Sequence, residues 1–249
     1  MSAALRAAGL CKRFGEFRAN DAISLELESG ARHALIGPNG AGKTTLVNLL
    51  TGVYAPSAGD VYLGSERVTP LAQHQRVQRG LARTFQINQL FSGLSVIDSV
   101  LIPICQRRGL GARIFAGQRS LDEPRREAWS LLERLRLADE AERLTRELAY
   151  GKQRLLELAL GLATRPRVLI LDEPASGIPA AESREMFEVI AALPRDVTVL
   201  FIEHDMDLVF RFAERISVLV AGRLLVEGDP DAIAKDARVR EVYLGEGEP

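Results

Sequence analysis

A glycine-rich segment, residues 37–45, limits what this chain can fold into more than any other part of the sequence. It fits the pattern G-x-x-x-x-G-K-[S/T] at every fixed position. Residues 32–36 before it are mostly apolar, as in a short strand, and residues 44–50 after it read as the start of a helix. Glycines between a strand and a helix let backbone N–H groups point inward, which predicts a phosphate cradle.

Two side chains of this cradle have defined chemistry. The ammonium group of Lys43 is expected on the β- and γ-phosphates of a nucleotide, and the hydroxyl group of Thr44 is expected as a ligand of Mg²⁺. The chain is therefore predicted to bind a nucleoside triphosphate. The predicted cradle residues are Gly37, Pro38, Asn39, Gly40, Ala41, Gly42, Lys43, Thr44 and Thr45.

Composition narrows the class of protein. Of the 249 residues, 47% are apolar and 26% are charged, as in a globular protein, and the net charge of −1 gives no sign of a nucleic-acid partner. The N-terminus lacks the apolar core of a signal peptide, and no apolar run approaches the ~20 residues of a membrane span. Any membrane role is thus expected through a partner. Cys11 and Cys105 are expected to be free thiols.

The strand and helix patterns predict an α/β fold. Strand patterns occur at residues 5–10, 23–28, 59–64, 168–171 and 197–202, and a terminal hairpin is predicted within residues 216–226. Between about residues 88 and 148, strand signals are few and apolar residues recur at helical spacing. We therefore predict a mixed-sheet core with antiparallel β elements and an inserted helical subdomain.

Two detailed expectations concern the helical insertion. Trp129 lies on or beside one helical face with Leu132 and Leu135, so we expect it in the core and not as a ligand platform. Asp122 is predicted as the N-cap of this helix, with Pro124 in its first turn.

A second motif follows the apolar strand at 168–171. Asp172 can hold the Mg²⁺ shell at the carboxyl end of this strand, and Glu173 can polarise a water molecule for attack on the γ-phosphate. Alone, an Asp-Glu pair at a strand end is often merely solvated. In the same chain as Lys43 the pair indicates nucleotide hydrolysis.

Together with these motifs, four further segments resemble the ATP-binding cassette ATPases, the motor subunits of ABC transporters. The resemblance covers nearly the whole chain. The family signature is matched by Leu148, Ala149, Tyr150, Gly151 and Lys152. Gln86 matches the glutamine loop, His204 matches the switch histidine, and Phe14 matches the aromatic residue that stacks on adenine, with Phe17 as a nearby competitor.

The resemblance implies a P-loop, RecA-like core and a mechanism. Two cassettes are expected to sandwich two ATP molecules, with the signature of one closing the cradle of the other. The implied catalytic residues are Glu173, His204 and Gln86, and the implied Mg²⁺ ligands are Thr44, Gln86 and Asp172. We predict a nucleotide-binding core at residues 1–87 and 155–249, and a helical subdomain carrying the signature at residues 88–154.

The subgroup can be narrowed further. Residues 83–86, 148–151, 202–206 and 242–246 resemble the importer cassettes for branched-chain or other hydrophobic amino acids. That resemblance implies a second cassette, two membrane permeases and, indirectly, a periplasmic binding protein. It places the chain as a peripheral subunit on the cytoplasmic face of the inner membrane. Urea or aromatic acids are alternative cargoes, and a homodimer is the alternative to a heterodimer.

Two residues depart from the family pattern. Ala149 replaces the usual signature serine, whose hydroxyl group contacts the partner's γ-phosphate, and Pro179 occupies the aspartate position of the D-loop. Whether Ala149 makes the two ATP sites unequal is left open by the sequence.

Three other readings compete with an importer subunit. A lipopolysaccharide-export cassette shares the C-terminal Tyr-Leu-Gly-Glu, but Tyr150 and Glu203 favour the importer. A soluble cassette protein of translation or DNA repair usually carries two cassettes or a long coiled coil. A P-loop kinase does not need the signature or His204. Neighbouring genes for permeases and a binding protein would decide between these classes.

Overall fold

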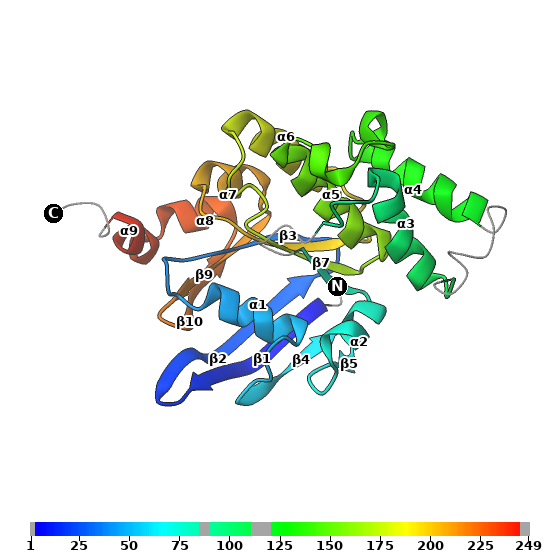
Figure 1. The fold of residues 1–249 in the computed structure, drawn as a ribbon. Coiled ribbons are helices and arrows are strands. Elements are labelled where there is room, and N and C mark those ends of the chain that lie inside the picture. The colour runs from blue at the N-terminus through cyan, green and yellow to red at the C-terminus, as the bar shows by residue number, and fades with distance from the viewer. Residues whose placement is uncertain (1–2, 85–89, 111–120, 245–249) are drawn as a thin grey trace.

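The computed structural model describes residues 3–84, 90–110 and 121–244. Two β-sheets and a set of helices make up this part of the chain (Figure 1). The six-stranded sheet has the order β10-β9-β3-β8-β7-β6, and its strands are parallel except for the antiparallel pair β9 and β10. The strands are β3 (Arg32–Ile36), β6 (Leu81–Arg83), β7 (Val168–Asp172), β8 (Thr198–Ile202), β9 (Arg215–Val220) and β10 (Arg223–Gly228).

The second sheet is antiparallel and comes from the N-terminal part of the chain. Its order is β2-β1-β4-β5, with the strands β1 (Ala3–Phe14), β2 (Phe17–Glu28), β4 (Ala58–Leu63) and β5 (Glu66–Arg67). The predicted strands at residues 5–10 and 23–28 are present, and both are longer than predicted. Helix α1 (Lys43–Thr51) lies between the two sheets (Figure 1).

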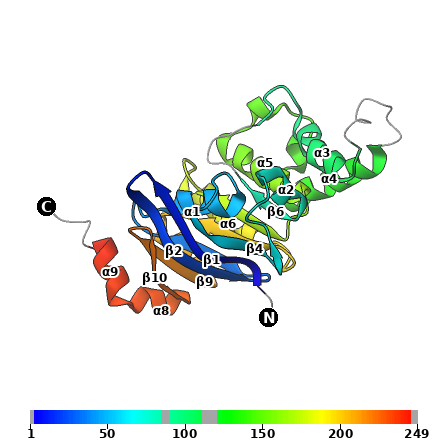
Figure 2. The ribbon, with the colours of Figure 1, turned by 90° about the horizontal axis from the view of Figure 1, so that it is seen from below.

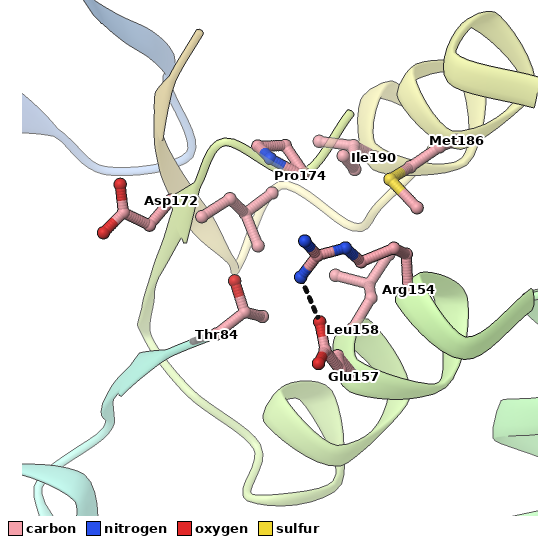
Figure 3. Close-up of a pocket in the computed structure, with 9 residues that line it drawn as sticks. Thr84, Arg154, Glu157, Leu158, Asp172, Pro174, Met186 and Ile190 are labelled. Carbon is pink, nitrogen blue, oxygen red and sulfur yellow. Dashed lines mark hydrogen bonds and ion pairs between the residues drawn. The ribbon is translucent and has the colours of Figure 1, made fainter. Parts of the chain in front are cut away.

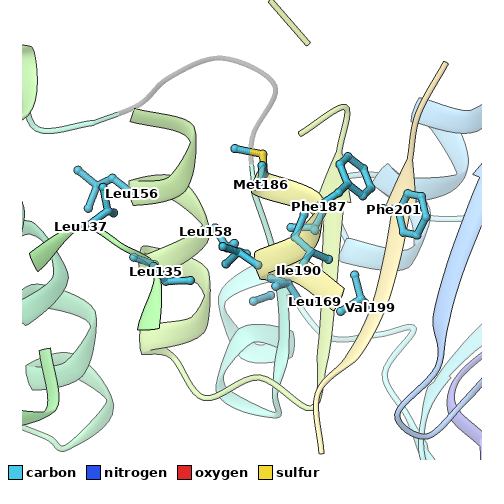
Figure 4. Close-up of a cluster of buried hydrophobic side chains, with 14 of the residues drawn as sticks. Leu135, Leu137, Leu156, Leu158, Leu169, Met186, Phe187, Ile190, Val199 and Phe201 are labelled. Atoms are coloured by element: carbon cyan, nitrogen blue, oxygen red, sulfur yellow. The ribbon is translucent and has the colours of Figure 1, made fainter. Parts of the chain in front are cut away.

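Both faces of the six-stranded sheet are buried. On β7, Val168 and Ile170 pack with α1 and the antiparallel sheet, whereas Leu169 and Leu171 pack with the helices on the opposite face. Because successive side chains of a strand point to opposite faces, an uninterrupted apolar run requires cover on both sides. Figure 4 shows Leu169 and its neighbours on this helical side. The prediction of a buried parallel strand at residues 168–171 is confirmed.

Eight further α-helices follow α1 in the described ranges. They are α2 (Gln73–Gln78), α3 (Val96–Arg107), α4 (Asp122–Arg134), α5 (Tyr150–Ala163), α6 (Ala180–Ala191), α7 (Met206–Phe212), α8 (Pro230–Lys235) and α9 (Ala237–Leu244). Helices α3, α4 and α5 pack together at one end of the molecule, and α8 and α9 lie at the other end (Figure 2). None of the helices in the described ranges combines the length and apolar character of a membrane span.

The structure corrects two expectations for α4 and bears out a third, since Pro124 lies in its first turn as predicted. The side of α4 that packs inward carries Ala128, Leu131 and Leu132, so the neighbouring Trp129 points outward, is 41% exposed and donates its indole N–H to Glu133. The core assignment of Trp129 was therefore wrong. Asp122 is the first helical residue and not the N-cap, which is Leu121. The Asp122 carboxylate lies in the first turn, where a negative charge interacts favourably with the positive end of the helix dipole.

The division of the chain into a core, residues 1–87 and 155–249, and a helical subdomain, residues 88–154, stays a proposal. Helices α3 and α4 fall inside this range, but the boundary between residues 154 and 155 lies within α5.

A buried polar chain joins three strands of the main sheet. The Nε2 atom of His33 lies 2.7 Å from the hydroxyl oxygen of Ser217, and that hydroxyl donates to Glu227 at 2.9 Å. Arg215 also donates to Glu227, at 2.8 Å. His33 has no exposed surface, so burial lowers its pKa to about 4. The chain ties β3, which leads into the cradle, to β9 and β10.

Candidate functional site

The predicted strand, loop and helix are present around the cradle. Strand β3 ends at Ile36, and α1 begins at Lys43 after the N-cap Gly42, whose φ of 98° requires glycine. At Gly37 a Cβ atom would collide with the carbonyl oxygen of Leu219. The first turn of α1 contains no acidic residue. Its N–H groups and positive dipole end therefore favour an anion at this point.

Lys43 supplies the positive charge of the cradle. Its side chain is 7% exposed, and its Nζ atom donates to the carbonyl oxygens of Gly37 at 2.6 Å and Pro38 at 3.0 Å. These carbonyls hold the ammonium group against the loop that is predicted to bind phosphate. The structure thus places the ammonium group within the cradle, where the sequence motif predicts it.

Asp172 lies at the end of β7 and is 2% exposed. Its carboxylate accepts a hydrogen bond from Arg83 Nη2 at 2.5 Å, and Arg83 Nη1 donates to Asn48 Oδ1 at 2.6 Å. One guanidinium group thereby joins the ends of β6 and β7 to α1. Sequence analysis missed this role of Arg83, because the two partners lie far from it along the chain.

Thr44 and Asp172 suit a hard cation. Mg²⁺ is usually held by one or two protein oxygens together with phosphate oxygens and water. The described residues contain no group of three or more His, Cys, Asp or Glu side chains placed to hold a metal. The third predicted ligand, Gln86, lies in residues 85–89, outside the described ranges. Its catalytic and metal-binding roles stay predictions.

Glu173 and His204 lie together, as their predicted roles require. His204 Nε2 is 3.0 Å from Glu173 Oε1, and both residues follow the carboxyl ends of adjacent parallel strands. The backbone of Glu173 has a φ of 50°, a left-handed conformation that costs an L-residue roughly 1–2 kcal/mol. A hydrogen bond of 3.0 Å from Glu173 N to Ile202 O holds this conformation in place.

Glu203 lies between β8 and His204 and is a buried acid. In the sequence it served only to favour an importer subunit over an export cassette. It is 5% exposed, and burial raises its pKa to about 7, helped by the negative charges of Glu173 and Asp205. Its carboxylate accepts backbone hydrogen bonds from Ala175 N at 2.8 Å and His204 N at 3.2 Å.

The signature segment (residues 148–152) forms the start of α5. Ala149 is the N-cap and makes no side-chain capping bond, and the helix begins at Tyr150. The hydroxyl group of Tyr150 accepts a hydrogen bond from Arg154 Nη2 at 2.8 Å. The ring of Tyr150 lies against Gly177, where an added Cβ would come within 3.1 Å of it.

The other signature residues have contacts within the same chain. Lys152 is paired with Glu140, and the Leu148 carbonyl accepts from Gln153 Nε2 at 3.0 Å. A Cβ on Gly151 would collide with the carboxylate of Glu182. The structure thus places the signature on α5 and the cradle on α1, as two separate elements.

A buried ion pair lies within the signature helix α5 itself. Arg154 Nη1 donates to Glu157 Oε2 at 3.0 Å, and burial raises the pKa of Glu157. Both side chains line a cavity of about 10 Å³ between α5, α6 and the end of β7, together with Thr84 and Pro174 (Figure 3). Sequence analysis did not identify this pair, since neither residue has a motif of its own.

Phe14 lies at the tip of the β1–β2 hairpin and is 46% exposed. Its ring meets Tyr54 edge to face at 5.6 Å between centroids, and Lys12 Nζ lies 5.1 Å from the Phe14 centroid. Phe17, the competing residue, is its cross-strand partner and is 66% exposed. An exposed aromatic ring suits stacking on a base, so the adenine role of Phe14 stays a prediction.

Comparisons with known proteins place these features in context. The family profile described as "ABC transporter" matches residues 20–176, and the profile described as "Branched-chain amino acid ATP-binding cassette transporter" matches residues 223–249. The high-affinity branched-chain amino acid transport ATP-binding protein BraF of Pseudomonas aeruginosa is 39% identical, with 97% of this chain and 98% of that protein aligned. LivG of Escherichia coli K12, which has the same description, is 40% identical, with 96% of each chain aligned.

Solved structures agree with this similarity. The ADP conformation of MJ1267, an ATP-binding cassette of an ABC transporter, superposes with a TM-score of 0.85 at 29% identity, covering 98% of this chain and 99% of that one. A nucleotide-free cassette from an ABC transporter gives the same TM-score over the full length of both chains. The arrangement of sheets and helices described above is therefore the cassette fold.

Proposed function

Because this chain belongs to the ABC transporter family, among its ATP-binding subunits for branched-chain amino acid transport, we propose that it hydrolyses Mg²⁺-bound ATP with Glu173 and His204. The observation that carries this proposal is the 3.0 Å contact between His204 Nε2 and Glu173 Oε1. The contact lies beside the strand that leads into the cradle, since β8 pairs with both β3 and β7.

The phosphates of ATP would bind the N–H groups at the start of α1. Lys43 would turn its ammonium group from the loop carbonyls toward the β- and γ-phosphates. Thr44 and Asp172 would hold Mg²⁺, which supplies charge neutralisation on the phosphate oxygens. Arg83 would keep the Asp172 carboxylate oriented by occupying its Oδ2 atom.

Glu173 would act as the general base. Its carboxylate accepts a proton from the attacking water as the oxygen of that water approaches the γ-phosphorus. His204 contacts Oε1 through Nε2 and so holds one oxygen of the base in a fixed direction. The strained backbone of Glu173 is consistent with a preorganised functional residue.

The partners follow from the family but belong to the proposal. A second cassette would close this cradle with its own signature, two permeases would carry the cargo, and a periplasmic binding protein would deliver it. The chain would then work as a peripheral subunit at the cytoplasmic face of the membrane. Branched-chain amino acids are the favoured cargo, because the descriptions of BraF and LivG name them. Leucine uptake by vesicles containing the assembled complex would test the cargo.

Replacing the base tests the catalytic proposal. Glu173→Gln keeps the size of the side chain but removes the proton acceptor, so ATP hydrolysis should fall about 10²-fold or more. ATP binding, measured by calorimetry, should persist. A matched control is Glu188→Gln, an exposed acidic residue of α6, which should hydrolyse ATP at the parental rate. Hydrolysis by Glu173→Gln at the parental rate would remove Glu173 from the mechanism.

A further inference from the structure

The ionised form of Glu203 is energetically unfavourable at its position. Glu203 is almost fully buried, the negative charges of Glu173 and Asp205 act on it, and its contact with His204 is to the backbone N–H of that residue. In the described ranges, no Lys or Arg side chain forms an ion pair with Glu203. A buried carboxylate without a cation is unfavourable unless hydrogen bonds compensate it. A residue kept there at such a cost calls for a functional explanation.

The hydrogen bonds of Glu203 connect the two segments that carry the proposed catalytic pair. Oε1 accepts from Ala175 N, two residues after Glu173, and Oε2 accepts from His204 N. The turn containing Ala175 is closed by a bond of 3.0 Å from Ser176 N to Glu173 O. One carboxylate therefore fixes the backbone on both sides of the contact between Glu173 and His204.

We propose that Glu203 is a positioning residue for hydrolysis, which clamps the turn after Glu173 to the backbone of His204 through its two carboxylate oxygens. The inference rests on the proposed function of Glu173 and His204. An ionised carboxylate can accept both backbone N–H groups fully. A protonated carboxyl group places an O–H where one acceptor is needed, so the clamp weakens when Glu203 takes up a proton.

Glu203→Gln reproduces the protonated state at every pH. The amide has one good acceptor and one donor, so it can satisfy only one of the two N–H groups. Since small displacements of reacting groups reduce rates strongly, we expect kcat of the full chain to fall about tenfold at pH 8. The ratio of parental to variant kcat should approach one at pH 5.5, because both proteins then lack the ionised clamp.

Asp205→Asn is the matched control. It removes one negative charge two residues from Glu203, and asparagine is as good an N-cap as aspartate for α7. Glu173, His204 and all other titratable groups remain in the Glu203 variant, so the pH dependence of the ratio reports on Glu203. For Asp205→Asn the ratio of parental to variant kcat should stay within about twofold of one at pH 8. At lower pH it should not rise, because loss of the Asp205 charge lowers the pKa of Glu203 and keeps the clamp ionised.

Two measurements separate positioning from a loss of structure. At pH 8 the Kd of Glu203→Gln for Mg²⁺-ATP should match the parent and its Tm should be no lower, because the variant lacks the buried charge, while kcat falls. A rise in Kd and a fall in Tm together with the fall in kcat, or a ratio of kcat values that is independent of pH, would overturn the inference. Glu173→Gln is assayed in parallel. If it hydrolyses ATP at the parental rate, the proposed function fails; if it is inactive while Glu203→Gln behaves like the parent, only the clamp fails.

Discussion

His33 allows a quantitative test of how burial in this fold acts on a titratable group. Its pKa falls from 6.5 to about 4, because the folded chain removes the imidazole from water. A base with a lower pKa in the folded than in the unfolded chain binds fewer protons when folded. Its contribution to stability is thus complete above about pH 6.5 and is lost as the pH falls toward 4. At ~1.36 kcal/mol per pKa unit, the loss amounts to about 3 kcal/mol.

The substitution His33→Gln isolates this contribution. Glutamine does not titrate and can still bond to Ser217, so the variant should lack the acid-dependent loss. The free energy of unfolding, measured by urea denaturation at several pH values, should differ between parent and variant by an amount that changes about 3 kcal/mol between pH 7 and pH 4. The parent is the protein that loses more stability in acid.

Glu203 acts in the opposite direction within the same range. Its pKa is raised in the folded chain, so the folded state binds its proton more tightly and gains stability as the pH falls. Both parent and variant carry Glu203, and its effect cancels in their difference. His74→Gln, at an exposed position on α2, is the control and should follow the parent. A parent-to-variant difference that stays constant from pH 7 to pH 4 would refute the reasoning.

Two further predictions concern the nucleotide. Lys43→Ala removes the cation of the cradle, so calorimetry should show an ATP affinity lower by about tenfold or more, which is ~1.4 kcal/mol; unchanged affinity would contradict the cradle assignment. Ala149→Ser adds a hydroxyl group at the N-cap of α5. In the assembled complex, Ala149→Ser should raise ATP turnover at the partner's site. Turnover is measured with the partner's cradle as the only active one. Equal turnover in the parent and the variant would mean that Ala149 creates no asymmetry between the two sites.

Local patterns predicted the parts of the fold that depend on neighbouring residues. The segment at 37–45 forms a loop between a strand and a helix because its glycines and flanking residues specify that arrangement locally. The strand before Asp172 is apolar on both faces and was found for the same reason. Trp129 was misplaced because helical spacing does not define the edge of a buried face to better than one residue.

The interactions that sequence analysis missed are long-range ones. Arg83 meets Asp172 and Asn48 only once β6, β7 and α1 have come together, and no short motif records this. The partners of Glu203 include an N–H group from a different βα turn. The environment that raises the pKa of Glu203 exists only in the folded chain. Neither the hydrogen-bond partners nor the raised pKa of Glu203 could therefore be inferred from residue type or spacing.

The cradle loop contacts β9 and the turn between β9 and β10, which come near the end of the sequence. This order has a consequence for protein synthesis. Gly37 packs against the carbonyl of Leu219, and Ala41 O accepts a bond of 2.9 Å from Gly222 N. The loop therefore leaves the ribosome long before the residues that shape it, and loops closed by such distant contacts form late in folding. A nascent chain that ends before β9 would carry the complete motif without these two contacts. Nucleotide binding is thus expected to reach full strength only when most of the cassette has been made.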